Sequence, residues 1–202
     1  MLPSSPSPFS QPGRKGADSG AIAPSQSGSR FDRLNKVLQG NQSPDEVFAA
    51  LMPLLGELLG CHRCFLYLRS PDTGLGRVPF CWRRTKDVPE VYDADWKAEP
   101  SSLAAEDPLF AAALRTAPSI FVEDVQSAPP HLVNPDFERE NFGHRALVHA
   151  HLCRDGQLWG VLQPCVFDRP RIWKEGDRYL ISHVVEQITP LAIQYVTREV
   201  ES

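Results

Sequence analysis

The chain has 202 residues and a mass of 22.5 kDa, which is enough for one domain of ordinary size. Its 42% hydrophobic and 23% charged residues exclude a fibrous or wholly disordered protein. The formal net charge of −4 and the isoelectric point near 5.9 provide no basic field, so we expect no binding to nucleic acid.

The cysteine and hydropathy patterns predict a cytoplasmic protein. Five cysteines, an odd number without a secretory leader, argue against a disulfide scaffold and for a reducing compartment. The most apolar stretch, residues 48–56, is interrupted by Glu57, whereas a membrane-spanning helix needs roughly 20 apolar residues. We therefore expect no membrane segment.

Residues 1–30 are predicted to form a disordered tail. They contain 5 Pro, 8 Ser and 4 Gly and almost nothing apolar to bury. A Ser-rich, acid-poor leader is also typical of organelle transit peptides, so that alternative stays open. One folded domain is expected over residues 31–202.

The first two elements predicted in this domain are helices. A short helix is expected over residues 31–38. Ser43, Pro44 and Glu46 form a capping box, and apolar residues at helical spacing follow until Gly60. This pattern predicts a helix that begins after Ser43 and packs a wide leucine stripe on the rest of the domain.

The remaining elements alternate between short strands and helices. Strands are expected over residues 63–69, 77–83, 119–125, 145–153 and 157–165, and helices over 107–114, 134–141 and 174–200. Asp155 and Gly156 between the last two strands predict a tight hairpin. Without a βαβ rhythm the class is α+β: a five- or six-stranded antiparallel sheet with the terminal helices on one face and the short helices and loops on the other.

Several short motifs resemble the GAF domain, most closely the GAF domains of cyanobacterial phytochromes and cyanobacteriochromes. The resemblance covers residues 43 to 197. The motifs that carry it are Leu158-Trp159-Gly160, Pro170-Arg171-Ile172-Trp173, Ala192-Ile193, Arg63-Cys64-Phe65, Asp107-Pro108-Leu109-Phe110 and Arg145-Ala146. It implies a regulatory fold that hosts many ligands and says little about activity.

The resemblance fails at the bilin attachment site. Bilin-binding members carry a Cys about ten residues before the Arg-Ala pair, where residues 132–136 here read Leu-Val-Asn-Pro-Asp. The family's chromophore-facing His corresponds to Cys165. No covalent bilin and no certain cofactor are therefore expected, although Arg145 matches the Arg that pairs with a chromophore propionate in relatives.

A ligand pocket is predicted beside the penultimate strand. If Arg145 lies on the pocket side, as in relatives, then alternation places His149 and His151 there too. Cys165 on the neighbouring strand, with Trp159 on the same face, would join them. Small-molecule binding by Arg145, His149, His151 and Cys165 is one interpretation. A polar lining without a ligand is another, and a metal held by the two His with Cys153 is a third, which we do not adopt.

Two further patterns give weak evidence for catalysis. Cys61 and Cys64 form a C-x-x-C, but no helix begins after them to lower a thiolate pKa, and packing explains them better. An acidic set around a loop, Asp93, Asp95, Glu106 and Asp107, has no fixed spacing, and Asp107 fits a helix N-cap. We therefore expect a protein that is not an enzyme.

The favoured interpretation is a stand-alone, non-catalytic GAF domain protein that acts in signalling through protein contacts, with or without a small molecule in its pocket. A homodimer or another signalling protein is the expected partner. The terminal helix is the expected interface, through Leu180, Val184, Ile188, Leu191 and Tyr195, because its apolar face is wider than one face of a small sheet is expected to cover. A sensor that binds a tetrapyrrole or another cyclic ligand non-covalently is the alternative, and a thiol-based redox enzyme is a third.

Overall fold

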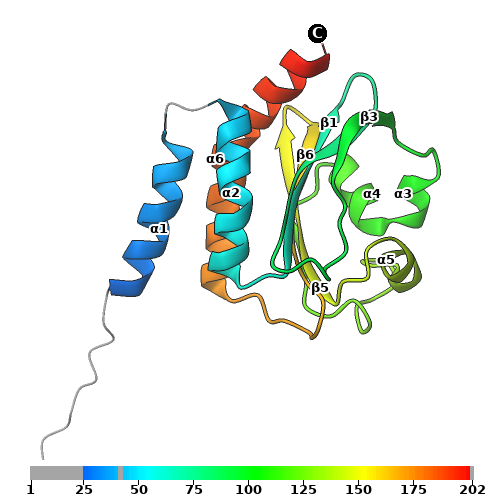
Figure 1. Ribbon diagram of the computed structural model, residues 1–202. Helices are drawn as coiled ribbons and strands as arrows, with labels where there is room; N and C mark the ends of the chain where they lie inside the picture. Colours follow the sequence, from blue (N-terminus) through cyan, green and yellow to red (C-terminus); the bar gives the residue numbers. More distant parts are fainter. Residues whose placement is uncertain (1–24, 41–42, 201–202) are drawn as a thin grey trace, which may run out of the picture.

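A computed structural model describes residues 25–40 and 43–200, and these residues are organised around a six-stranded antiparallel sheet (Figure 1). The strand order is β3-β2-β1-β6-β5-β4, so strands β1 and β6, distant in sequence, pair at the centre. The strands are β1 (Arg63–Ser70), β2 (Leu75–Arg83), β3 (Asp93–Ala98), β4 (Ile120–Val122), β5 (Ala146–Arg154) and β6 (Gln157–Val166).

Helices cover both faces of this sheet. The long helices α1, α2 and α6 lie on one side, and the short helices α3, α4 and α5 lie on the other (Figure 1). The predicted α+β class and the terminal helices on one face are confirmed. The helices are α1 (Ser25–Leu38), α2 (Pro44–Leu59), α3 (Leu103–Glu106), α4 (Pro108–Leu114), α5 (Pro135–Asn141) and α6 (Glu175–Val200).

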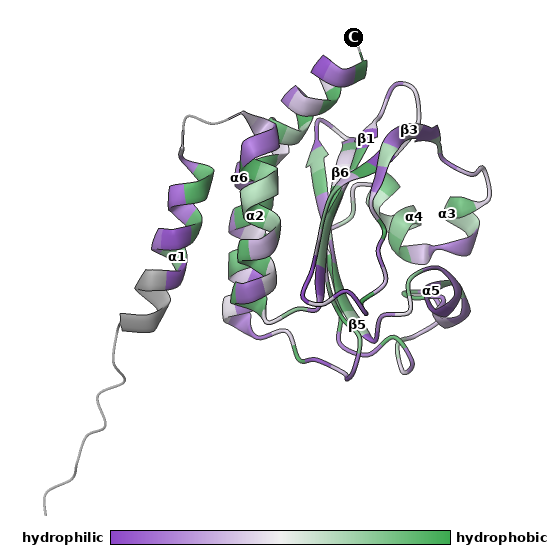
Figure 2. Ribbon diagram, viewed as in Figure 1, coloured by the Kyte–Doolittle hydropathy of each residue, from purple (hydrophilic) through white to green (hydrophobic). Residues whose placement is uncertain are grey.

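The long-helix side holds the larger part of the core. Alternate residues of β5, among them Val148 and Ala150, pack against apolar residues of α2 and α6. Figure 2 shows α2 largely green, whereas α5 on the opposite side is largely purple. Helix α2 begins as predicted, because the Ser43 hydroxyl accepts from the Glu46 N–H and the Glu46 carboxylate accepts from the Ser43 N–H.

Helix α1 begins at Ser25, earlier than the start at residue 31 that composition predicts. Leu34 is fully buried, and the guanidinium of Arg33 pairs with the Glu57 carboxylate of α2 at 3.0 Å. These contacts to α2 come from tertiary structure and leave no local signal in a Ser-rich segment. Of the predicted tail over residues 1–30, residues 1–24 lie outside the part of the chain that the structure describes.

Strand β3 and helix α3 are two elements that the sequence patterns miss. Asp93 and Asp95, expected in a loop, lie on β3, which pairs only with β2 at the edge of the sheet. An edge strand with one neighbour needs no apolar alternation, so its polar sequence resembles a loop. Trp96 is the β3 residue that packs against the long-helix core.

Strand β6 carries one extra residue opposite β5, at Trp159. Leu152 pairs with Gly160 and Cys153 pairs with Leu158, so Trp159 has no partner on β5. A bulge of this kind shifts the alternation of side chains by one residue. Trp159 accordingly packs against the long-helix core, and the expectation that it shares a face with the pocket residues of β6 is wrong.

The apolar row of α6 is also placed differently from the prediction. Leu180, Val184, Ile188 and Tyr195 are each at most 4% exposed and belong to the chain's own core, and Leu191 packs against it half-buried. The sheet together with α2 is wide enough to cover the whole row. These residues therefore offer no surface to a partner. Among the described residues, no helix has the length and hydropathy to cross a bilayer.

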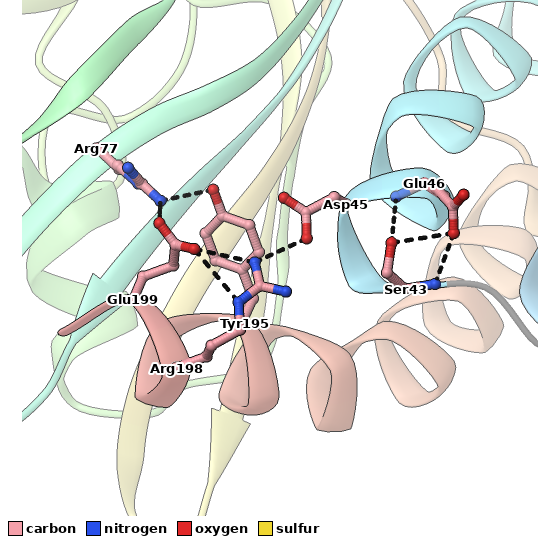
Figure 3. A network of polar contacts seen from close by, with 7 residues as sticks. All are labelled: Ser43, Asp45, Glu46, Arg77, Tyr195, Arg198 and Glu199. Atoms are coloured by element: carbon pink, nitrogen blue, oxygen red, sulfur yellow. Dashed lines mark hydrogen bonds and ion pairs between the residues drawn. The ribbon is translucent and has the colours of Figure 1, made fainter. Parts of the chain in front are cut away.

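The last turns of α6 are fixed to the sheet and to α2 by a polar network (Figure 3). Arg77 of β2 donates from Nη2 to the Tyr195 hydroxyl at 2.6 Å and to Oε2 of Glu199 at 2.7 Å. Its guanidinium also lies over the Trp96 ring, 4.6 Å from the centroid. Arg198 extends the network to Asp45 at the start of α2, with an Nη2–Oδ2 distance of 2.8 Å.

We predict that Arg77→Ala lowers the free energy of unfolding by about 2–3 kcal/mol, because the Tyr195 hydroxyl loses its donor, Glu199 loses one of its two arginine partners and the Trp96 ring loses its cation. Urea unfolding followed by circular dichroism measures the change. The matched control is Arg33→Ala, which breaks an ion pair whose side chains are both 56% exposed and should cost less than about 1 kcal/mol. Equal losses in the two variants would contradict a special role for Arg77.

Candidate functional site

The short-helix side of the sheet contains a cavity of about 230 Å³. It lies between the sheet and the segments that carry α3, α4 and α5. Its walls are mainly apolar, with Phe65, Tyr67, Val78, Phe110, Phe142 and Val161 among the lining residues. Six charged or polar side chains interrupt this lining: Lys97, Glu99, Asp107, Glu138, His149 and Gln163.

Asp107 reaches the cavity because it caps helix α4. Its Oδ1 accepts from the Leu109 N–H at 2.9 Å, as the predicted N-cap requires, and the residue is only 7% exposed. Burial and the nearby Glu138 carboxylate raise the pKa of Asp107 to about 6. No cationic side chain among the described residues forms an ion pair with it. Asp107 is therefore a buried carboxylate with no ion-pair partner of its own, and the nearby imidazolium of His144, which acts to lower its pKa, is already paired with Glu138.

Glu138 is the buried residue of the otherwise polar helix α5, at 2% exposure. Its Oε2 forms a buried ion pair with Nε2 of His144, which is 4% exposed. Burial alone would lower the pKa of His144, but the Cys165 sulfur and the Glu138 carboxylate outweigh it and raise the pKa to about 9. Glu138 thus has a cationic partner on one oxygen and faces the cavity as well.

His149 and His151 form a hydrogen-bonded pair on β5. His151 Nδ1 lies 2.7 Å from the Ala117 carbonyl oxygen, and its Nε2 lies 2.9 Å from His149 Nδ1. Burial lowers the pKa of both imidazoles, so both are neutral at physiological pH. Because the Ala117 carbonyl only accepts, His151 carries its proton on Nδ1, and His149 must donate from Nδ1 to His151 Nε2. His149 Nε2 is then a free acceptor.

Gln163 is the second polar residue that the sheet directs into the cavity. It lies on β6 opposite Phe65 of β1 and is 4% exposed. Its side-chain amide has no hydrogen-bond partner in the part of the chain that the structure describes. Near the mouth, by contrast, Glu99 is satisfied by the Tyr67 hydroxyl at 2.6 Å and by Arg69 Nε at 2.8 Å. The unfilled hydrogen-bonding capacity is deep in the cavity.

The strand order, the helices on both faces and this cavity are accompanied by a sequence match. The GAF domain family model matches residues 43–189. This chain belongs to the GAF domain family. A search of curated proteins by sequence finds no match.

Solved structures share the GAF fold at low sequence identity. A GAF domain from an Acinetobacter phosphoenolpyruvate-protein phosphotransferase has a TM-score of 0.62 and 11% identity, covering 85% of this chain and 97% of that one. A phycoerythrobilin-bound GAF domain from a cyanobacterial phytochrome has a TM-score of 0.64 and 17% identity, covering 86% and 99%. A GAF domain from Synechocystis, in its photoproduct state, has a TM-score of 0.58 and 23% identity, covering 77% of this chain and 98% of that one.

The GAF fold places the four predicted pocket residues in different environments. His149 lines the cavity, and His151 does not line it but is hydrogen-bonded to His149. Arg145 does not line the cavity: its Nε and Nη2 bind the Asp124 carboxylate at 2.5 and 3.0 Å, and this pair holds the pKa of Asp124 at about 2. Cys165 is fully buried in the packing below the cavity. The expectation that all four face a ligand is therefore wrong for Arg145 and Cys165.

The cysteines of this GAF domain are all free thiols, and none lines the cavity. Burial raises the pKa of Cys61 to about 12 and that of Cys64 well above its usual value. Cys64 packs in the long-helix core, as predicted. The C-x-x-C is thus a packing feature, and a metal between His149, His151 and Cys153 has no support, because the two imidazoles bond to each other.

Sequence reasoning misses Glu138, places Gln163 on the same strand face as Cys165 without assigning it a role, and explains Asp107 as a cap. A single signal was available for Glu138: the segment over residues 134–141 has few apolar residues, so one of its polar side chains had to face inward. Gln163 lies within an apolar strand, and alternation would have placed it beside Val161 on the cavity face.

We predict that Asp107→Asn raises the free energy of unfolding by about 1–2 kcal/mol at pH 7, because Asn keeps the cap and removes a buried charge. A folded pKa of about 6, above the usual 3.8, means that the wild type loses stability as pH rises between these values. The gain should therefore disappear near pH 4. Urea unfolding at both pH values measures it.

The control for this prediction is Asp124→Asn, which removes a carboxylate whose pKa is lowered by Arg145. The Asp124→Asn protein should have a lower free energy of unfolding than the wild type at pH 7, whereas Asp107→Asn should have a higher one. An Asp107→Asn protein that is less stable than wild type by the same amount at pH 4 and pH 7 would contradict the assignment of Asp107 as an unpaired buried charge.

Proposed function

We propose that this GAF domain protein is a non-catalytic regulatory module that binds a small organic molecule in the cavity and transmits the bound state to another protein. The observation that carries the proposal is that Nε2 of His149 and the side-chain amide of Gln163, two residues that line the cavity, have no hydrogen-bond partner among the described residues. A buried polar group without a partner costs about 1–3 kcal/mol. A ligand that supplied the missing hydrogen bonds would offset this cost.

The size of the cavity favours a compact ligand. Sites for drug-sized molecules enclose roughly 300–1,000 Å³, and this cavity measures about 230 Å³. A tetrapyrrole is larger than such molecules and would require the segments around the cavity to move apart. The alternative of a non-covalent tetrapyrrole sensor is therefore less well supported, although GAF domains with bound phycoerythrobilin or biliverdin share this fold.

The chemistry of the lining supports a binding role over a catalytic one. The described residues that line the cavity include no serine, threonine or cysteine to act as a nucleophile. The thiol-based redox alternative is weakened further because the cysteines lie elsewhere and burial raises the pKa of Cys61 and Cys64. We therefore propose that the ligand leaves the cavity unchanged.

The route from cavity to partner is proposed to begin at the edge of the sheet. Lys97, Glu99 and Leu103, on β3, the following loop and α3, line the cavity together with the central strand residue Gln163. A ligand that contacts both sides would tie this edge segment to the rigid sheet. A homodimer or a signalling protein remains the proposed partner, through a surface other than the buried row of α6.

Native mass spectrometry of the protein isolated from the organism that makes it tests the proposal. We expect a mass above that of the chain, which disappears when the same sample is denatured. Gln163→Leu should lower the ligand-bound fraction about tenfold or more while keeping the fold. Gln157→Leu, on the same strand but exposed, is the matched control and should retain the ligand.

A wild-type sample that carries no additional mass under native conditions would contradict the proposed ligand. Loss of the ligand in both glutamine variants would show that the effect comes from strand β6 in general and not from the cavity. The first result would return the regulatory role to protein contacts alone, and the second would contradict the assignment of the ligand to this cavity.

A further inference from the structure

We infer that the ligand is a small organic cation, namely a protonated amine attached to a compact apolar or aromatic frame. This inference rests on the proposed function and specifies the ligand class. It follows from three independent features of the cavity: a buried carboxylate without an ion-pair partner of its own, an imidazole held as an acceptor, and aromatic walls.

Asp107 supplies the charge. Glu138 has His144 as its cationic partner and Glu99 has Arg69, but Asp107 receives only backbone N–H groups of α4. Lys97 also lines the cavity, yet its side chain is 60% exposed and is bound to Asp93 on its own strand at 2.5 Å. The buried carboxylates of Asp107 and Glu138 thus share a single buried cation, His144, and a cation inside the cavity would meet a net negative charge.

His149 supplies the hydrogen-bond polarity. The fixed proton positions between the Ala117 carbonyl, His151 and His149 leave Nε2 of His149 as a lone-pair acceptor at a residue that lines the cavity. This atom rejects an anion or a ligand that only accepts. An ammonium group has three donors and no acceptor, which fits Asp107, His149 and the carbonyl oxygen of the Gln163 amide.

The aromatic walls supply the apolar complement. Phe65, Tyr67, Phe110 and Phe142 line the same cavity, and ring faces attract a cation as well as an apolar frame. A cavity of about 230 Å³ accommodates a one-ring amine but is small for a nucleotide. Acceptors, negative charge and ring faces thus converge on one ligand class.

Isothermal titration of the purified chain with benzylamine, benzyl alcohol and benzoate tests the inference. The three probes share one ring and differ in charge: at pH 7.5 the first is a cation, the second is neutral and the third is an anion. We expect benzylamine to bind at least about tenfold more tightly than benzyl alcohol, and benzoate to show no binding.

Two variants locate the effect. Asp107→Asn keeps the helix cap and should abolish the preference for benzylamine over benzyl alcohol, and its circular dichroism reports that the fold is intact. Asp124→Asn, a carboxylate paired with Arg145 outside the cavity lining, should keep the preference. Retention of the preference in Asp107→Asn would overturn the inference.

The outcomes separate this inference from the proposed function. Equal or tighter binding of benzyl alcohol or benzoate would overturn the cationic class while supporting a ligand cavity. Failure of all three probes would also overturn the inference, because a one-ring amine is its simplest case. Native mass spectrometry of the protein from its own organism tests the proposed function independently, because it detects a bound ligand of any class.

Discussion

The structure depends above all on the packing of α2 and α6 against one face of the antiparallel sheet. This face contains the long-helix core, in which residues such as Phe48, Leu66, Val148 and Ile188 are completely buried. Burial of apolar surface on this scale is the dominant favourable contribution to folding. Because one face supplies this stabilisation, the opposite face tolerates a cavity and buried polar groups that would destabilise a smaller domain.

The two faces of the sheet therefore differ: one holds the larger apolar core and the other holds the cavity. On the short-helix side, Asp107, His149 and Gln163 each retain unfilled hydrogen-bonding capacity or charge, and none of them improves the packing of the empty protein. Natural proteins accept local instability of this kind where a site must bind something. The same reasoning explains why the polar groups at the cavity mouth, such as Glu99, are satisfied within the protein, whereas the deeper groups are not.

Other GAF domains share the fold of this chain but little of its sequence. The chain overlaps almost the whole length of a phycoerythrobilin-bound cyanobacterial domain at 17% identity, a level at which only the fold is shared. In this chain Arg145 is bound to Asp124 and Cys165 lies below the cavity, so two positions that the resemblance associates with a chromophore have become structural. The group that faces the cavity from β5 is His149.

The outcomes for individual elements show which predictions a sequence supports. The capping box at Ser43, the Asp155-Gly156 hairpin and the N-cap at Asp107 are local patterns, and all three occur as predicted. The edge strand β3 was missed because a strand with one neighbour needs no apolar alternation. Trp159 was placed on the wrong face because the bulge there depends on pairing with β5, which the sequence of β6 does not contain.

The sequence by itself determined the α+β class, the GAF resemblance and most helix and strand positions, because these follow from local periodicity and capping. Only the tertiary structure decided which apolar residues are buried and which polar residues line the cavity. It buried the row Leu180, Val184, Ile188 and Tyr195 in the chain's own core, and it brought Asp107, Glu138, His149 and Gln163 from four different elements to one cavity. Such convergence depends on long-range packing and strand order, which leave no periodic signal along the chain.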